Sequence, residues 1–197
     1  MMHFKASLII RNMFMKAPIA LLLAVIASPS FADSLALDLN DNSLRLNYQH
    51  SLDTHYQADA AWIHTKDLGN TITAGFNLKQ TLNNDISALI GGKAVFQQHD
   101  NWPDGTAIAI GGTLRITPAA NKNVAVSLSG YFAPNVLSFG DMDNYRELEL
   151  RGEYQVSEQL TAYVGYRNNR ADYNLSGVKS NGIELYDGAM IGGEFHF

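Results

Sequence analysis

Apolar and polar residues alternate with a period of two in short segments along residues 33–197. In one such segment Leu44 and Leu46 alternate with Arg45 and Asn47. This alternation is typical of β-strands with one apolar and one polar face, and clusters of Asn, Asp, Gly and Pro separate the segments. Ten segments can be distinguished, within residues 34–40, 43–50, 56–62, 72–78, 86–96, 108–116, 124–132, 148–156, 160–166 and 183–197. The sequence therefore predicts an all-β protein.

The connections between these segments alternate in length. The short ones are 51–54, 82–85, 118–123 and 157–159, and three of the others are longer, 98–105, 134–145 and 168–182. Outer-membrane barrels have short periplasmic turns and longer external loops. Because hydrocarbon offers the backbone no hydrogen-bonding partner, a sheet that crosses it must close on itself. We therefore predict an antiparallel transmembrane β-barrel with ten strands, one for each segment.

The first two segments introduce an alternative strand count. Segments 34–40 and 43–50 contain seven and eight residues, whereas a membrane-crossing β-strand needs about nine to eleven. If these two segments formed a short hairpin beside the barrel, eight strands would remain in the wall. The ten-stranded barrel is the prediction, and the eight-stranded barrel is its alternative.

Aromatic residues lie near the ends of the apolar rows, as expected where rings meet lipid head groups. The candidates for two aromatic girdles are Tyr48, Tyr56, Tyr154 and Phe195 at the end with short turns, and Trp62 and Tyr166 at the end with long loops. Phe76 departs from this pattern because it lies nearer the middle of its row. The sequence ends at Phe197 within a strand-like segment. This terminal Phe resembles the assembly signal that the barrel-assembly machinery recognises in outer-membrane proteins.

Residues 1–32 carry the features of an export signal. They contain three basic residues and no acidic one, then the apolar stretch 17–27 and a small-x-small site that ends at Ala32. The apolar stretch is too short to span a bilayer as a helix. We predict a signal peptide that is cleaved after Ala32 in a Gram-negative bacterium and leaves one domain, 33–197; an uncleaved anchor is the alternative.

Composition excludes several classes of protein. The chain has no Cys, so disulfides and thiolate chemistry are excluded. Asp and Glu outnumber Lys and Arg by 19 to 14, which argues against a nucleic-acid partner. The sequence has no metal-ligand spacing, nucleotide-binding motif or hydrolase motif. We therefore predict no cofactor, no metal site and no catalytic residue.

The polar rows place acidic and basic residues in the barrel interior in nearly equal numbers. Tight turns place Asp38 directly opposite Arg45, and Glu149 opposite Arg167. The candidates for interior salt bridges are Asp38, Arg45, Glu149, Arg151, Glu153 and Arg167. Because a barrel of about eight to ten strands is narrow enough for side chains to fill, we predict a filled lumen. A narrow pore for small solutes is the alternative.

The predicted external loops are the candidate interaction surface. We expect the apolar loop residues Val136, Leu137 and Phe139 to fold back over the end of the barrel, and the alternative is that they form a contact surface. The prediction is a non-enzymatic barrel with a structural or interaction role. The alternative from a different class is a lipid A-modifying enzyme that uses His64 or His99 near the outer rim.

Three parts of the sequence resemble the YfaZ family of outer-membrane proteins, namely 35–48, 131–141 with 144–147, and 163–167. The resemblance extends over the whole of 33–197. It implies a location in the bacterial outer membrane, and it implies no activity or site residues because the family is defined without them. In that membrane we expect a monomer whose partners are outer-membrane lipids and lipopolysaccharide, and the barrel-assembly machinery during insertion.

Overall fold

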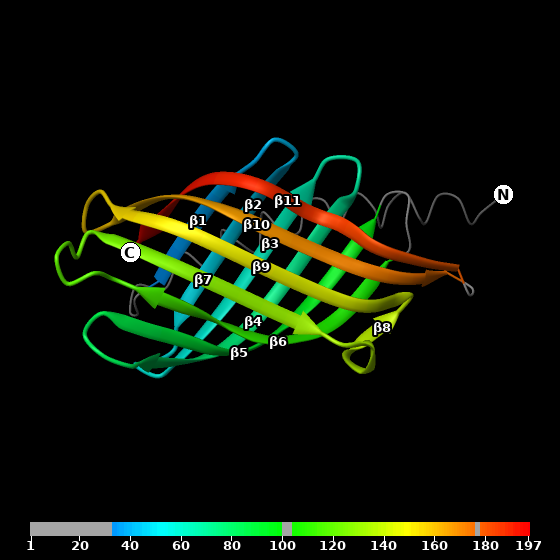
Figure 1. Cartoon of the computed structure of the whole chain (residues 1–197), viewed down its shortest axis with the longest axis horizontal. Coiled ribbons are helices and arrows are strands. Elements are labelled where there is room, and N and C mark those ends of the chain that lie inside the picture. The colour runs from blue at the N-terminus through cyan, green and yellow to red at the C-terminus, as the bar shows by residue number, and fades with distance from the viewer. Residues whose placement is uncertain (1–32, 100–103, 176–177) are drawn as a thin grey trace, which may run out of the picture. The chain divides into compact units, whose positions relative to one another are not determined.

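The wall of the molecule is one antiparallel β-sheet that closes into a barrel (Figure 1). The computed structural model describes residues 33–99, 104–175 and 178–197, so the predicted signal peptide lies outside the described residues. The ten strands of the wall are β1 (Asp33–Leu39), β2 (Ser43–Ser51), β3 (Tyr56–Thr65), β4 (Gly69–Thr81), β5 (Ile86–His99), β6 (Gly105–Ile116), β7 (Val124–Ala133), β9 (Met142–Gln155), β10 (Leu160–Leu175) and β11 (Val178–His196). Within these ranges, no helix has the length and apolar character needed to cross a membrane.

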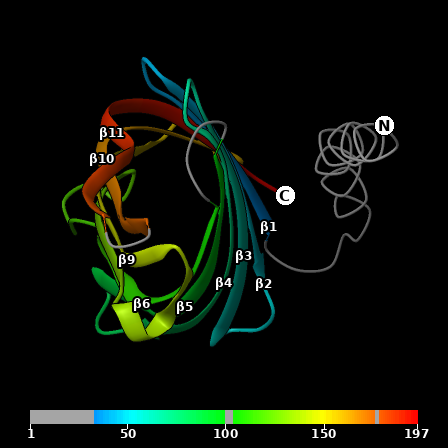
Figure 2. The same cartoon turned by 90° about the vertical axis from the view of Figure 1, so that its right-hand side faces the viewer.

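Closure of the wall is achieved by pairing between its first and last strands. β1 runs antiparallel to β11, with Ser34 opposite His196. The Phe197 N–H donates to the Asp33 carbonyl at 2.9 Å, and the Asp33 N–H donates to the Phe197 carbonyl at 3.2 Å. The prediction of ten strands is confirmed and the eight-stranded alternative is wrong, because β1 and β2 belong to the closed ring of strands (Figure 2).

The two ends of the barrel differ in their connections. We call the end with connections 52–55, 82–85, 117–123 and 156–159 the turn end, and the opposite end the loop end. At the turn end, the Asp53 carboxylate accepts hydrogen bonds from the main-chain N–H groups of His55 and Tyr56 at 2.6 and 2.7 Å. These bonds close the tight turn between β2 and β3, and they lower the pKa of the Asp53 carboxyl group because they favour its charged form.

The height of the wall is uneven around the ring. β1, β2 and β3 contain 7, 9 and 10 residues, whereas β9, β10 and β11 contain 14, 16 and 19. The long β11 continues past the end of β1 toward β3. There Thr65 Oγ1 donates a 2.8 Å hydrogen bond to the Leu185 carbonyl. This bond joins the loop-end half of β11 to the short strands.

One of the three predicted long loops, 168–182, is mostly strand, and strands also enter both ends of another, 98–105. β5 continues to His99 and β6 begins at Gly105, while β10 continues to Leu175 and β11 begins at Val178. In these hairpins backbone groups pair with the neighbouring strand, and side chains continue to alternate between interior and exterior in β10. The polar composition of 168–182 favours a loop, but the pairing between β10 and β11 on the taller side of the wall continues through most of this segment.

The third predicted loop, between β7 and β9, contains two short elements. These are a 3-10 turn, η1 (Asn135–Leu137), and β8 (Ser138–Gly140). β8 pairs with the first residues of β6, with Phe139 opposite Thr106. The segment is therefore attached to the wall where β7 no longer pairs with β6.

The apolar rows of the strands point outward. On β9, Leu148 and Leu150 are 56% and 50% exposed, whereas Glu147 and Glu149 are 8% and 6% exposed. Other exposed large apolar side chains include Leu37, Ile72, Ile90, Ile110, Leu128, Phe132, Val164 and Ile191. Such an extensive apolar outer surface is typical of a barrel in a bilayer and not of a protein in water.

The aromatic candidates lie in the outward-facing rows. They are Tyr48, Tyr56, Tyr154 and Phe195 toward the turn end, and Trp62 and Tyr166 toward the loop end. Phe76 lies near the middle of β4, as predicted, and its ring stacks on the Tyr56 ring with centroids 5.5 Å apart. The Tyr166 hydroxyl donates to the Asp187 carboxylate at 2.5 Å, which satisfies the polar end of an otherwise lipid-facing ring.

A bulge in β11 reverses the alternation of side chains there. Uniform alternation predicts Ile183 and Leu185 toward lipid and Glu184 toward the lumen. Tyr186 pairs with Asn169 and Glu184 pairs with Arg170, so Leu185 is an extra residue on β11. Ile183 and Leu185 consequently pack in the interior, and Glu184 is exposed with its carboxylate 2.9 Å from Arg170 Nη2.

Candidate functional site: the barrel interior

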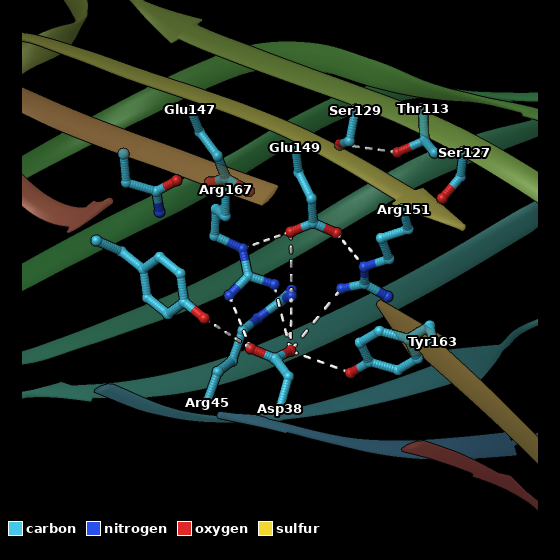
Figure 3. Close-up of polar contacts among 12 residues, drawn as sticks. Asp38, Arg45, Thr113, Ser127, Ser129, Glu147, Glu149, Arg151, Tyr163 and Arg167 are labelled. Carbon is cyan, nitrogen blue, oxygen red and sulfur yellow. Dashed lines mark hydrogen bonds and ion pairs between the residues drawn. The ribbon is translucent and has the colours of Figure 1, made fainter. Parts of the chain in front are cut away.

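A network of charged side chains crosses the centre of the lumen (Figure 3). Its members, called here the central network, are Asp38, Arg45, Glu149, Arg151 and Arg167. Asp38 lies opposite Arg45 in the β1–β2 register, and Glu149 lies opposite Arg167 in the β9–β10 register. The two cross-strand pairs predicted from the turns therefore meet in one cluster.

Arg167 connects the two carboxylates of the central network. Its Nη1 and Nη2 atoms donate to the two Asp38 oxygens at 3.0 and 3.3 Å, and its Nε donates to Glu149. Both Arg167 and Asp38 are fully buried. Because a buried charge is costly unless it is paired and hydrogen-bonded, this bidentate contact accounts for how the two groups remain inside the barrel.

Arg45 and Arg151 complete the network from β2 and β9. Arg45 Nη1 lies 3.7 Å from Asp38 and 3.5 Å from Glu149. Arg151 pairs with Glu149 through Nε, and its Nη2 lies 4.0 Å from Asp38. The network thus holds three cations and two anions. It carries one excess positive charge.

Tyrosine side chains surround this excess positive charge. The Arg151 guanidinium lies 4.4 Å from the Tyr163 ring centroid, and that of Arg167 lies 4.7 Å from the Tyr186 centroid. The Tyr163 hydroxyl also donates to Asp38 at 3.1 Å. Aromatic faces attract cations, most strongly in desolvated surroundings. The two rings therefore stabilise the guanidinium groups.

A second ion pair lies beside the central network. Lys93 Nζ is 3.1 Å from Glu147, and the Tyr145 hydroxyl donates to the same carboxylate at 2.7 Å. Lys93 Nζ also lies 3.8 Å from the centroid of the Tyr131 ring. This pair links β5 to β9 across the interior. Lys93 lies in a polar row of β5, so the alternation places it in the lumen, but the alternation does not identify a partner on β9, which is not adjacent to β5.

The loop-end half of the lumen is filled by an apolar and aromatic cluster, called here the loop-end plug. Its buried members are Val95, Ala107, Ala109, Tyr131, Ala133, Met142, Tyr145, Ala171, Tyr173 and Leu185, with Leu137 and Ile183 packed against them. The Tyr173 hydroxyl contacts Gln97 and lies 2.8 Å from His99 Nε2, so the polar end of this buried ring is satisfied. No continuous water path is expected through such a cluster.

The loop-end plug is not evident from the sequence alone. Tyr145 lies at the edge of a segment expected to be a loop, and Tyr173 lies inside another. A signal for them exists, because Tyr145 is in the same alternating row as Glu147 and Glu149. Continuing that row past the expected end of the strand would have placed the ring in the interior.

The turn-end half of the lumen is open and polar. It contains a cavity of about 630 Å³, called here the turn-end cavity, whose lining includes Gln49, Gln57, Asp59, Asn77, Lys79, Ser127 and Glu194. The predicted side-chain filling therefore does not extend to the turn end, where this cavity lies. Glu153 lies in this open half, where it pairs with Arg115 at 2.9 Å and accepts from Ser127 at 2.8 Å. It is not part of the central network.

The histidines of the suggested lipid-modifying site are not brought together. His64 is exposed on the outer face, where its ring stacks with Trp62 at 6.1 Å. His99 instead contacts the interior Tyr173. Across the residues that the structure describes, no group of three or more His, Cys, Asp or Glu side chains is arranged to hold a metal ion.

A closed antiparallel barrel with an apolar outer face and a polar interior defines the class of outer-membrane β-barrel proteins. Within this class the chain belongs to the YfaZ family, because the family model described as "YfaZ precursor" matches residues 12–197. The chain is also similar to "Outer membrane protein YfaZ" of Escherichia coli (strain K12), with 28% identity over 132 residues, which are 66% of this chain and 69% of that protein. The protein is thus located in the outer membrane, as predicted.

A comparison with solved structures gives a fold-level likeness to a structure of the NanC porin. The match covers 84% of this chain and 99% of that chain, with 10% sequence identity and a TM-score of 0.46.

Proposed function

We propose that this protein is a non-conducting outer-membrane barrel that acts through the surface at its loop end. The observation that supports the proposal is the presence of side chains across the interior at two levels of the barrel. The central network spans the interior from β1 and β2 to β9 and β10, and the loop-end plug lies beyond it. A solute entering at the turn end meets both layers.

The η1–β8 segment supports an interaction role at the loop end. Val136 is 79% exposed and Phe139 is 50% exposed, whereas Leu137 packs against the loop-end plug. The expectation that all three fold back over the barrel is therefore correct only for Leu137. The pairing of β8 with β6 fixes the segment, so its apolar side chains are displayed with little conformational freedom to lose on binding.

Planar-bilayer recording tests the closed lumen. We expect the purified protein to give no steady single-channel steps, because charged side chains in the centre and apolar ones at the loop end leave no continuous aqueous path. Steady steps of uniform size would instead support the alternative of a narrow pore for small solutes.

Site-specific photocrosslinking in living cells tests the interaction surface. A photoreactive residue at position 136, exposed at the loop end, is expected to form a discrete adduct with a partner. The matched control is position 122 in the turn-end connection 117–123, where the same partner should be absent. If neither position gives an adduct, or both give the same one, the loop-end surface is not the site of interaction.

A further inference from the structure

The turn-end cavity has the features of a built binding site. Its volume of about 630 Å³ falls within the range of about 300–1,000 Å³ typical of small-molecule pockets. Side-chain amides and hydroxyls contribute much of its lining, including Asn47, Gln49, Gln57, Asn77, Ser127 and Ser129. These groups both donate and accept hydrogen bonds. The cavity therefore suits a solute that is rich in groups of the same dual character.

One buried acceptor in the lining has no partner. Asn47 is only 3% exposed, and its Oδ1 atom makes no hydrogen bond with the described residues. Its neighbour on the same row, Gln49, accepts from Gln57 Nε2 at 3.1 Å. A buried carbonyl that lacks a donor is unfavourable. Because the Oδ1 atom itself has almost no accessible area, a small rotation of the Asn47 side chain toward the cavity would let a hydroxyl group there satisfy this acceptor.

A carboxylate on the adjacent strand provides a second acceptor. Asp59 lies opposite Gln49 in the β2–β3 register, one step diagonally from Asn47. It accepts from Asn77 Nδ2 at 2.8 Å, and within the described ranges no basic side chain pairs with it. Gly75 makes room for it, since a Cβ there would collide with the carboxylate. Two acceptors on neighbouring strands match a solute with adjacent hydroxyl donors.

The charges of the cavity favour an uncharged solute. Five basic and six acidic side chains line it. Several already neutralise one another, as Arg115 does with Glu153 and Lys93 with Glu147. A solute with a net charge gains little from a lining whose positive and negative side chains nearly balance, and Asp59 can instead accept hydrogen bonds from neutral hydroxyl groups. The Tyr131 face is also occupied by Lys93, so binding depends on hydrogen bonds more than on stacking.

We propose that the turn-end cavity binds a small neutral saccharide of one or two rings. The ligand's adjacent hydroxyl groups donate to Asp59 and Asn47, and hydroxyl side chains such as Ser127 and Ser129 face it across the cavity. Because the central network closes the path beyond the cavity, the saccharide binds and leaves through the same end. This site lies at the opposite end of the barrel from the loop-end surface, and it is independent of the function proposed for that surface.

Calorimetric titration of the full barrel tests the proposal. The protein is held in lauryldimethylamine oxide, a detergent without a sugar head group, and titrated with maltose, glucose, glucuronate or glucosamine. We expect saturable binding of maltose or glucose, and weaker binding of the anionic and cationic sugars. Absence of saturable binding by both neutral sugars would overturn the proposal. So would tighter binding of glucuronate than of maltose.

Two variants and one control locate the site. Asp59→Asn keeps the shape of the side chain and removes its negative charge, so the hydrogen bond from the ligand is no longer charge-assisted. The affinity for maltose or glucose should therefore fall about tenfold. Asn47→Leu removes the unpartnered acceptor and should also weaken binding. Asp143→Asn makes the same chemical change as Asp59→Asn outside the cavity and should leave affinity unchanged. Folding of each variant is checked by its heat-dependent mobility on gels, and folded Asp59→Asn and Asn47→Leu proteins with unchanged affinity would contradict the assignment.

Discussion

Arg167 is the residue on which the central network depends most. It is fully buried and donates to both Asp38 and Glu149. Removing one partner from a buried ion pair costs about 3–5 kcal/mol, because the other charge stays buried. In the Arg167→Met variant, Arg45 and Arg151 remain near both carboxylates. We therefore expect the free energy of unfolding to fall by about 3 kcal/mol, the lower limit of this range. Urea unfolding in detergent, followed by tryptophan fluorescence, measures this change in the free energy of unfolding.

Arg115→Met is the matched control for that substitution. Arg115 also pairs with a carboxylate, that of Glu153, but its side chain is 47% exposed. Exposed ion pairs contribute only about 0–1 kcal/mol, so this variant should unfold close to the wild type. If both variants lost the same stability, burial would not distinguish the two pairs, and the importance given to Arg167 would be wrong.

Some contacts of the central network can be predicted from the sequence, and others cannot. Neighbours across adjacent strands follow from the turns, and so Asp38 with Arg45 and Glu149 with Arg167 could be written down in advance. The bond between Asp38 and Arg167 joins β1 to β10, which are not adjacent. Such contacts depend on the diameter and cross-section of the barrel, and strand alternation carries no information about either.

At the scale of elements, the alternation predicted strands well where pairing is uninterrupted. It failed in β11, where the bulge at Leu185 turns Ile183 inward and Glu184 outward. A bulge is set by pairing with the neighbouring strand, and nothing in the local sequence marks it. On the tall side of the wall, β10 and β11 also extend further than predicted. Asn, Asp and Gly in 168–182 favour a loop locally, but pairing between β10 and β11 makes most of this segment strand.

The closing pair of strands, β1 and β11, makes a prediction about Phe197. Its main chain bonds to Asp33, and its ring is 46% exposed and stacks with Phe195 at 6.0 Å. Phe197→Ala keeps the main-chain bonds and removes only the ring. We expect refolding into detergent to proceed as in the wild type, while the amount of protein assembled in the outer membrane of cells decreases. Equal decreases in both assays would assign the ring to stability of the barrel, and not to recognition by the assembly machinery.

At the scale of the whole molecule, the described side chains pack the interior of the barrel at one end and leave a cavity at the other. The loop-end plug fills the interior beneath η1 and β8, while the turn-end cavity opens beside the tight connections. Short connections of outer-membrane barrels face the periplasm. The cavity is then accessible from inside the cell envelope, and the exposed apolar side chains of η1 and β8 face the outside.

This orientation can be tested with single cysteines, because the chain has none of its own. Val136 is exposed at the loop end, and Thr54 is exposed at the rim of the turn-end cavity. A membrane-impermeant maleimide added to intact cells should label Val136→Cys and leave Thr54→Cys unlabelled, since only the first lies outside the outer membrane. In purified protein both should react, which shows that each thiol is accessible. The reverse pattern in cells would place the turn-end cavity at the cell surface and the η1–β8 segment in the periplasm.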